Sequence, residues 1–134
     1  MDKIKKIVEW TKIKIRLEKK NKGKIYFHER EIWWVNLGIN IGFEQDGKHK
    51  NCERPALILK KFNKNLFWIL PLSSRSKDNQ YYLPFKYQEK GKIKNGIVIL
   101  SQIRTVSNKR LLRKIGVIPK NEFNIIRNKV KNLI

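Results

Sequence analysis

Cysteine is almost absent from this chain of 134 residues, which contains a single one, Cys52. One cysteine excludes an internal disulfide and any zinc site that uses several thiolates. Long apolar runs are also missing: the longest, from Leu66 to Leu72, is far shorter than the roughly 20 residues that a membrane-spanning helix needs. We therefore expect a cytoplasmic protein with neither a signal peptide nor a membrane anchor.

Acidic residues are scarce as well. There are 11 Asp and Glu against 32 Lys and Arg, which gives a formal net charge of +21. A field of this sign attracts polyanions and speeds their encounter with the protein, so a nucleic acid or an acidic protein is the expected partner. The alternative is that the lysines only decorate a solvated surface, because net charge determines association rather than fold.

The first 28 residues read as an extension. Apolar residues recur at helical spacing over residues 1–20 and predict a basic amphipathic helix, which Asn21-Lys22-Gly23 would end. This helix could lie on a membrane or clamp a nucleic acid, but we expect its apolar face to dock on the domain. The apolar residues are Ile4, Ile7, Val8 and Ile15, with Trp10, Ile13 and Leu17 widening the face.

Residues 29–134 form the main domain, in which short apolar stretches alternate with turn residues. Their β-branched and aromatic content predicts strands at residues 32–37, 56–62, 66–70, 81–87, 97–100 and 116–118. Pro71 and Pro84 indicate edges or bulges. We expect a short helix near residues 108–115 and a final helix that begins at Pro119. The expected fold class is α+β, with a small curled antiparallel sheet or barrel closed by helices.

The glycine-rich stretch between the first two strands is unusually long. It contains Gly38 and Gly42 and continues as a polar loop to Glu53. Loops of this length in small domains are often functional. Pro55 disfavours helical backbone at Arg54, so this arginine is expected in an extended conformation at the end of the loop.

Five short pieces of the chain occur in an order that resembles the MazF/PemK toxins, over about residues 29 to 134. The pieces are Glu31 to Val35 (EIWWV), Gly42 to Gly47 (GFEQDG), Arg54 to Leu59 (RPALIL), Pro71 to Ser74 (PLSS) and Ile99 to Thr105 (ILSQIRT). The resemblance implies an SH3-like barrel, a homodimer, and cleavage of single-stranded RNA at short sequences without a metal ion or another cofactor. It also implies a cognate acidic antitoxin that binds the toxin and keeps it inactive.

The resemblance further implies which residues act. By position, Arg54 matches the family's catalytic arginine and Ser73 matches its catalytic threonine, so a hydroxyl is kept. A slip of one residue in the match would give this role to Ser74. Glu44 and Gln45 resemble family residues that touch RNA or close over it.

Four other residues are candidates for RNA contact because of their type and position. Phe43 could stack on an exposed base, or it could tuck its loop onto the sheet. Arg75 lies in the polar loop after the two serines, and Gln102 follows a strand. Arg104 could lie near the path of the phosphates or form a structural ion pair.

The chemistry of a metal-free cut suits these residue types. The ribose 2′-hydroxyl attacks the phosphorus, and the products are a cyclic phosphate and a 5′-hydroxyl. The enzyme must stabilise a phosphorane that carries extra negative charge, and it must move two protons. The forked guanidinium of Arg54 can donate two hydrogen bonds to this charge, and Ser73 can add one. Because an arginine side chain holds its proton far above neutral pH, we expect it to stabilise the transition state rather than to carry protons.

Simpler interpretations of these two residues stay open. Arg54 could be a surface arginine paired with Glu53 or Glu44, and Ser73 could be an ordinary turn serine.

Other sites and functions also compete. A two-histidine ribonuclease site would have to use His28 and His49, and a thiol nucleophile would have to be Cys52, which has no evident base partner. A gyrase-poisoning toxin of the same fold relies on a C-terminal Trp-Gly-Ile, whereas this chain ends in Asn-Leu-Ile. A non-catalytic nucleic-acid-binding barrel would need only the charge.

Overall fold

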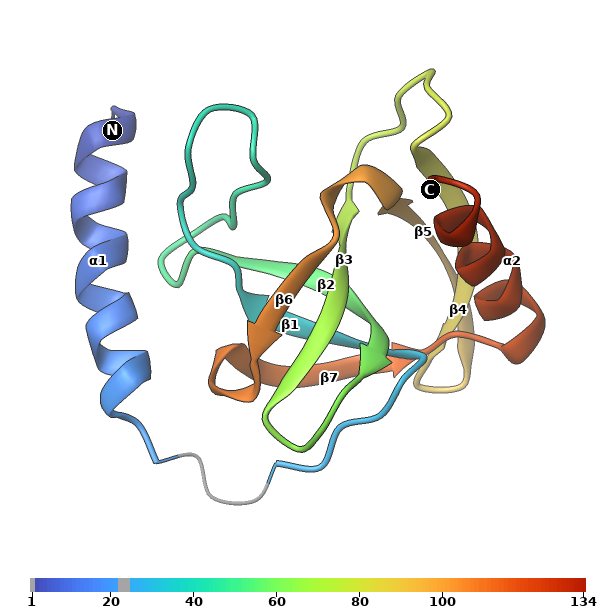
Figure 1. Ribbon diagram of the computed structural model, residues 1–134, viewed down its shortest axis with the longest axis horizontal. Helices are drawn as coiled ribbons and strands as arrows, with labels where there is room; N and C mark the ends of the chain where they lie inside the picture. Colours follow the sequence, from blue (N-terminus) through green and yellow to red (C-terminus); the bar gives the residue numbers. More distant parts are fainter. Residues whose placement is uncertain (1, 22–24) are drawn as a thin grey trace.

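The structure of the protein is a computed structural model, which describes residues 2–21 and 25–134. In this part of the chain two α-helices flank a β-barrel (Figure 1). The expected helix-ending residues Lys22 and Gly23 lie outside the described residues. The elements are α1 (Lys3–Lys19), β1 (Glu31–Asn36), β2 (Glu53–Lys61), β3 (Leu66–Ser73), β4 (Tyr82–Glu89), β5 (Lys92–Ile99), β6 (Arg104–Ser107), β7 (Leu111–Val117) and α2 (Lys120–Lys131), with 3₁₀ turns at Leu100–Gln102 and Asn108–Arg110.

Six of the strands close into an antiparallel barrel, in the order β1, β2, β3, β5, β4 and β7. β1 pairs with β2 on one side and with β7 on the other, and the pair of Gln88 and Val117 joins β7 to β4. β6 lies outside this ring and pairs with the first half of β3. The predicted small antiparallel barrel, with helices near both ends of the chain, is therefore confirmed.

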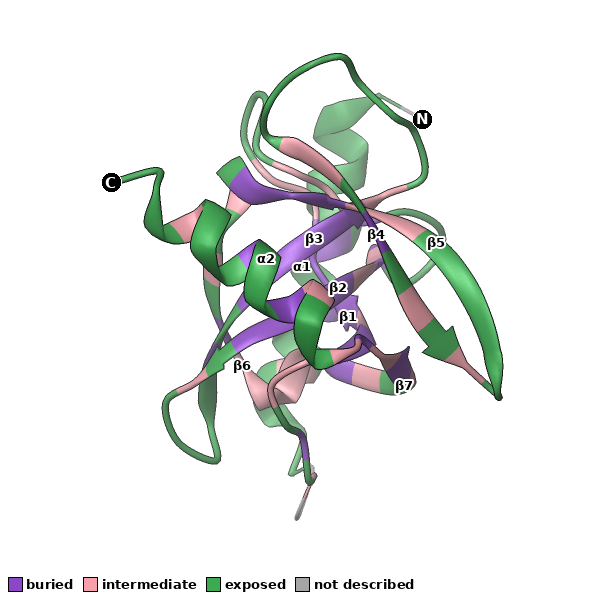
Figure 2. Cartoon of the chain, turned by 90° about the vertical axis from the view of Figure 1, so that its right-hand side faces the viewer, coloured by how far each residue is buried: buried purple, intermediate pink, exposed green. Residues whose placement is uncertain are grey.

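Alternation of side chains along the strands divides the core into two clusters. Ile32 of β1 and Leu57 of β2 belong to one cluster, which Phe123 of α2 covers. Val35 and Ile58, on the opposite faces of the same strands, belong to the other. Figure 2 shows the buried residues concentrated on β1, β2 and β3, whereas the β4–β5 hairpin is largely exposed. The inner strands therefore form a rigid frame for the loops at their ends.

The prediction of a short helix near residues 108–115 is wrong. Only Asn108–Arg110 form a helical turn, and the following residues form strand β7. The spacing of Leu111, Leu112 and Ile115 imitates a helix because β7 pairs irregularly with β1. The register shifts twice along this pair, and such bulges break the strict alternation of a strand.

Proline explains how β3 serves two neighbours. β3 pairs with β6 up to Ile69 and with β5 from Leu72 onward, and Pro71 lies between the two ladders. A proline cannot donate a backbone hydrogen bond, so it fits at such a change of partner. Pro71 is neither at the end of β3 nor at a bulge: it pairs with Ala56 of β2, at the point where the partner on the other side of β3 changes. Ser73 is the last residue of β3.

α1 docks on the barrel domain with only part of its apolar surface. Trp10 and Ile13 are buried, and together with Leu17 they pack against Cys52 and Ile39 of the long loop. The prediction that the whole wide face docks is wrong, because the other apolar residues of α1 are largely exposed to solvent. Neither α1 nor any other helix of the described residues is long and apolar enough to span a membrane.

The contact between α1 and the loop leaves no space for a side chain at Gly38. This glycine has φ of +91°, and a Cβ added there would lie 2.4 Å from Cε2 of Trp10. We expect Gly38→Ala to lower the free energy of unfolding by about 2–3 kcal/mol, through backbone strain and displacement of the indole. Denaturant unfolding of Gly91→Ala provides the control, since Gly91 has φ of +74° but no neighbour within 4 Å. Equal losses in the two variants would contradict the close packing of Trp10.

Candidate active site

The long loop between β1 and β2 is held by hydrogen bonds at its base and across its width. The amide of Gly38 donates to the carbonyl oxygen of Cys52 at 3.0 Å, and the amide of Gly47 donates to the carbonyl oxygen of Gly38 at 2.7 Å. The amide of Asn40 donates to a carboxylate oxygen of Asp46 at 2.5 Å. The loop therefore has a defined conformation of its own.

α1 supports the same loop from outside. Nζ of Lys3 donates to the carbonyl oxygen of Gly42 at 3.2 Å, and it forms an ion pair with the carboxylate of Asp46 at 3.3 Å. Trp10 contacts Gly38 at the base of the loop. The helix therefore contacts both ends of the segment that leads to Arg54.

Arg54, near the start of β2, is held from several sides and is only 8% exposed. Nε donates to the carbonyl oxygen of Asp46 at 2.6 Å, and Nη1 donates to the carbonyl oxygen of Leu72 at 2.9 Å. With its amide oxygen turned toward the guanidinium, Gln45 accepts a hydrogen bond from Nη2 at 2.8 Å. The loop and the end of β3 thus fix the guanidinium together.

No carboxylate among the described residues forms an ion pair with Arg54. Glu53 pairs with Arg113 at 3.4 Å, and the carboxylate of Glu44 accepts the amide of Ile41 within its own loop. The alternative of a surface arginine paired with Glu53 or Glu44 is therefore wrong.

The Arg54 guanidinium keeps capacity for an anion. An arginine has five N–H groups, and three of them are engaged by the acceptors on Asp46, Leu72 and Gln45. Two N–H groups stay available for the oxygens of a phosphate. Burial lowers the pKa of Arg54 from its ordinary value, and the nearby charge of Asp46 acts in the opposite direction. A buried cation that lacks a bonded carboxylate favours a bound anion, because the anion restores the interactions lost on burial.

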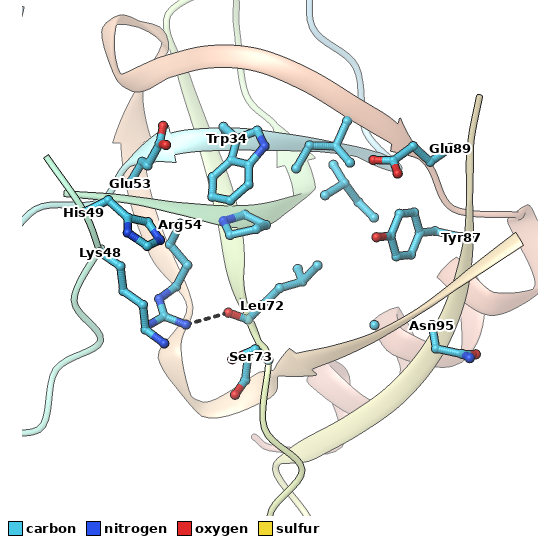
Figure 3. A pocket seen from close by; sticks show the side chains of 15 residues that line it. Trp34, Lys48, His49, Glu53, Arg54, Leu72, Ser73, Tyr87, Glu89 and Asn95 are labelled. Atoms are coloured by element: carbon cyan, nitrogen blue, oxygen red, sulfur yellow. Dashed lines mark hydrogen bonds between the residues drawn. The ribbon is translucent and has the colours of Figure 1, made fainter. Parts of the chain in front are cut away.

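Arg54 lies in the wall of a pocket of about 360 Å³ (Figure 3). The side chains on the two sides of this pocket are Lys48, His49 and Arg54 on one, and Tyr87, Glu89 and Asn95 on the other. Trp34 lines it as well, with the guanidinium of Arg113 at 4.9 Å from its ring. The pocket thus combines cations, two aromatic rings and a few polar groups, which suits a nucleotide.

The structure places Ser73 and Ser74 in the wall of the same pocket. The hydroxyl of Ser73 donates to the carbonyl oxygen of Arg75 at 2.9 Å and lies 3.1 Å from the amide of Arg75. The peptide just before Ser73 is the one that Arg54 contacts through the Leu72 carbonyl. Arg54 and Ser73 are therefore neighbours at one site, as the sequence predicts, although their side chains are not bonded to each other.

Lys48 is a pocket residue that the sequence does not identify, and His49, which the sequence suggests only as half of a two-histidine site, lines the same pocket. They belong to a segment between Gly47 and Glu53 that separates the glycine motif from the arginine. His28 lines a different pocket, beside Lys61, so the described residues contain no two-histidine site. Burial and the Asp46 charge raise the pKa of the Cys52 thiol, which disfavours a thiolate nucleophile.

The other predicted RNA-contacting residues lie around the loop rather than in the Arg54 pocket. Phe43 is fully exposed, so it does not tuck the loop onto the sheet.

Gln102 accepts a hydrogen bond from the amide of Gln45 at 3.2 Å, and it donates one to the carbonyl oxygen of Phe43 at 3.2 Å. Nη1 of Arg104 donates to the carbonyl oxygen of Leu37 at 3.0 Å. Gln102 and Arg104 thus brace the loop. Arg75 is exposed beyond Ser73.

Arg110, a half-buried arginine, lies beside Arg104. Nη1 of Arg110 donates to the carbonyl oxygens of Asn36 and Leu37, at 3.0 and 3.4 Å. Burial and the neighbouring charge of Arg104 lower the pKa of Arg110 to about 10. The base of the loop is therefore strongly positive.

Comparison with known structures shows the same barrel in several toxins. MazF from Deinococcus radiodurans superposes with a TM-score of 0.61 at 20% identity, over 81% of this chain and 97% of that one. A MazE–MazF structure from the same organism gives a TM-score of 0.58 at 19% identity, over 81% of this chain and 96% of that one. The toxin MazF-mt6 from Mycobacterium tuberculosis gives a TM-score of 0.55 at 15% identity, over 77% of this chain and 94% of that one.

Sequence comparison points the same way. No curated protein matches the chain at a significant level. A family model described as the PemK-like, MazF-like toxin of type II toxin–antitoxin systems matches residues 28–134, which comprise the whole barrel and α2. The helix α1 precedes the matched region. This chain therefore belongs to the PemK-like, MazF-like toxins of type II toxin–antitoxin systems.

Proposed function

We propose that this toxin is a metal-independent, sequence-specific endoribonuclease that cuts single-stranded RNA. The observation that supports this most is the state of Arg54. Its guanidinium is buried in a pocket wall, is fixed by three acceptors, and forms no ion pair with a described carboxylate. A fixed, unpaired guanidinium is what stabilisation of a developing phosphorane requires.

In this proposal Arg54 binds the scissile phosphate with its two remaining N–H groups. The 2′-oxygen attacks the phosphorus, the bond from phosphorus to the 5′-oxygen breaks, and a 2′,3′-cyclic phosphate forms. The extra charge of the phosphorane falls on the non-bridging oxygens, where Arg54 and the Ser73 hydroxyl donate hydrogen bonds. The Ser73 hydroxyl has to leave the Arg75 carbonyl oxygen in order to do so.

The same step needs a base that takes the proton of the 2′-hydroxyl and an acid that supplies one to the 5′-oxygen. We assign one of these roles to His49, because it is the imidazole in the pocket wall beside Arg54 (Figure 3). An imidazole exchanges protons near neutral pH far more readily than a guanidinium does. Lys48 adds a further positive charge at the same side.

His49→Gln is expected to lower kcat about 100-fold, because proton transfer to or from the substrate is lost. His28→Gln is the matched control, since His28 lines another pocket. A folded His49→Gln protein with the kcat of the wild type would remove His49 from the proton transfers.

We assign sequence specificity to the part of the pocket wall that carries the aromatic rings and the polar groups beside them. Trp34 and Tyr87 provide aromatic surfaces on which a base can stack, and Glu89 and Asn95 provide an acceptor and an amide for its edge. The guanidinium of Arg113 lies 4.9 Å from the centre of the Trp34 ring, and this cation–π contact helps to hold the ring in the pocket wall.

Trp34→Ala is expected to weaken the binding of a short RNA substrate about 10–100-fold, because one stacking surface is lost. The effect should appear in KM more than in kcat, since Trp34 does not contact the reacting phosphate in this proposal. Trp68→Ala is the control: Trp68 is a half-exposed tryptophan of β3 that bonds Thr105 outside the pocket. An equal KM effect in the two variants would contradict a base site at Trp34.

One experiment tests the activity itself. The purified protein is incubated with a long single-stranded RNA in EDTA, and the new ends are mapped. We expect cuts at a short repeated sequence, with 5′-hydroxyl ends, in the wild type and in Cys52→Ala. Tight, salt-sensitive binding without any cut would instead indicate a nucleic-acid-binding barrel without catalysis. Inhibition of gyrase without RNA cutting would indicate the gyrase-poisoning alternative.

We further propose an acidic antitoxin and a homodimer as the biological assembly. MazF of D. radiodurans has been crystallised with MazE, which supports a protein partner for this toxin. The net charge of +21 favours an acidic one. Light scattering of the purified chain tests the dimer, and a monomer at micromolar concentration would contradict it.

A further inference from the structure

α1 carries a second apolar stripe that nothing in the described chain covers. Ile4, Val8 and Ile15 are 75%, 52% and 53% exposed, and Ile7 is more than one-third exposed. The docked residues Trp10, Ile13 and Leu17 lie on nearly the opposite side of the helix. In Figure 1, α1 stands at the margin of the molecule, with the barrel domain on one side only.

The spacing of this stripe is that of a helix–helix seam. Ile4, Val8, Thr11 and Ile15 follow one another at intervals of four, three and four residues. This is the repeat by which the a and d positions of a coiled coil face a partner helix. A single helix that docks on a domain needs one apolar stripe, so a second stripe at seam spacing indicates a second helical contact.

The positive charges beside the stripe favour an acidic partner helix. Over Lys3–Lys19 there are seven Lys or Arg and two Glu, a net charge of +5. Lys5, Lys12 and Lys19 follow at intervals of seven, which places them in one row beside the seam. Two copies of α1 would bring these charges together and repel each other. An acidic amphipathic helix would meet the row of lysines with opposite charge.

We propose that the outer face of α1 docks an acidic amphipathic helix of the antitoxin. This inference rests on the antitoxin partner proposed above, and it concerns a helix that lies outside the matched family region. The stripe from Ile4 to Ile15 is about 17 Å long, which is about three helical turns. A seam of this length binds weakly alone, so it acts as an added anchor that raises the affinity of a partner bound elsewhere on the toxin.

The test uses Val8→Lys/Ile15→Lys in the full chain. Both residues are half exposed, so the double variant is expected to fold and to cut RNA as the wild type does. Ile93→Lys/Ile125→Lys is the matched control, because it adds the same charge at exposed apolar residues of β5 and α2. The first probe is a labelled peptide of about three heptads with leucine at a and d and glutamate at e and g. We expect its affinity to fall about 10-fold or more in the α1 variant and to stay unchanged in the control.

The second probe distinguishes the source of the helix. It is the acidic antitoxin that the proposed function predicts in the adjacent reading frame, co-expressed and purified, and we expect about a 10-fold loss of affinity in the α1 variant alone. Equal binding of either probe to both double variants, or no binding of the peptide to the wild type, would overturn the inference. So would self-association of the wild type that the α1 variant abolishes, because the occupant would then be a second copy. RNA cutting is measured in parallel, so the proposed activity stands or fails independently.

Discussion

Arg54→Ala is expected to lower kcat for RNA cleavage by about 1,000-fold or more, while the protein stays folded. The loss removes both N–H groups that this account assigns to the phosphorane, and loss of one such donor alone typically costs about 100–1,000-fold. Arg54→Lys keeps the positive charge but not the fork, so we expect at least a 100-fold loss in this variant too. Single-turnover cleavage of a short RNA measures both.

The same substitutions also remove hydrogen bonds to Asp46 and Leu72, so folding has to be measured beside activity. Thermal unfolding and circular dichroism of Arg54→Lys serve this purpose. Arg127→Ala on α2 is the matched control, because Arg127 is an exposed arginine far in the chain from the pocket. A folded Arg54→Lys protein that cuts RNA at the wild-type rate would contradict the role of the guanidinium.

Trp10→Ala is also expected to lower cleavage strongly, although Trp10 does not line the pocket. Its indole is buried between α1 and the loop, and its loss is expected to lower the stability of that contact by about 3 kcal/mol. The loop then loses its support near Gly38, and the Asp46 carbonyl that holds Arg54 becomes less well placed. A small displacement of a catalytic group costs up to about 100-fold, so we expect cleavage to fall 10–100-fold.

Hydrogen exchange distinguishes this effect from general unfolding. In Trp10→Ala, the amides of α1 and of the long loop are expected to exchange faster, while those of β2 and β3 keep their protection. Trp68→Ala is again the control, since it truncates a tryptophan on the outer side of β3. Wild-type cleavage by a Trp10→Ala protein with an unprotected α1 would show that the helix does not support the site.

The strands and the arginine were accessible to sequence reasoning because their signals are local. The β-branched and aromatic content of short apolar stretches predicts β1, β2 and β3, and Pro55 predicts the extended backbone at Arg54. The order of short motifs identifies the family and places Arg54 and Ser73 together. The irregular pairing of β7 with β1 misled the prediction, because bulges replaced alternation by a spacing typical of a helix.

The contacts that prepare the site could not be predicted, because they join distant parts of the chain. The carbonyl of Leu72 and the loop residues around Arg54 meet only in the folded barrel. His49 reaches the pocket wall from a loop segment whose path no periodicity describes. The two stripes of α1 read in the sequence as one wide apolar face, and only the docking of Trp10 separates them.

Cleavage of an RNA that carries a single 2′-deoxynucleotide at the mapped cut site tests directly whether the 2′-hydroxyl attacks the phosphorus. If Arg54 stabilises attack by the 2′-hydroxyl, that one bond resists cutting, while the unmodified RNA is cut in EDTA and ends in a cyclic phosphate. Cutting of the deoxy-substituted bond at the normal rate, or products with 5′-phosphate ends, would contradict the account.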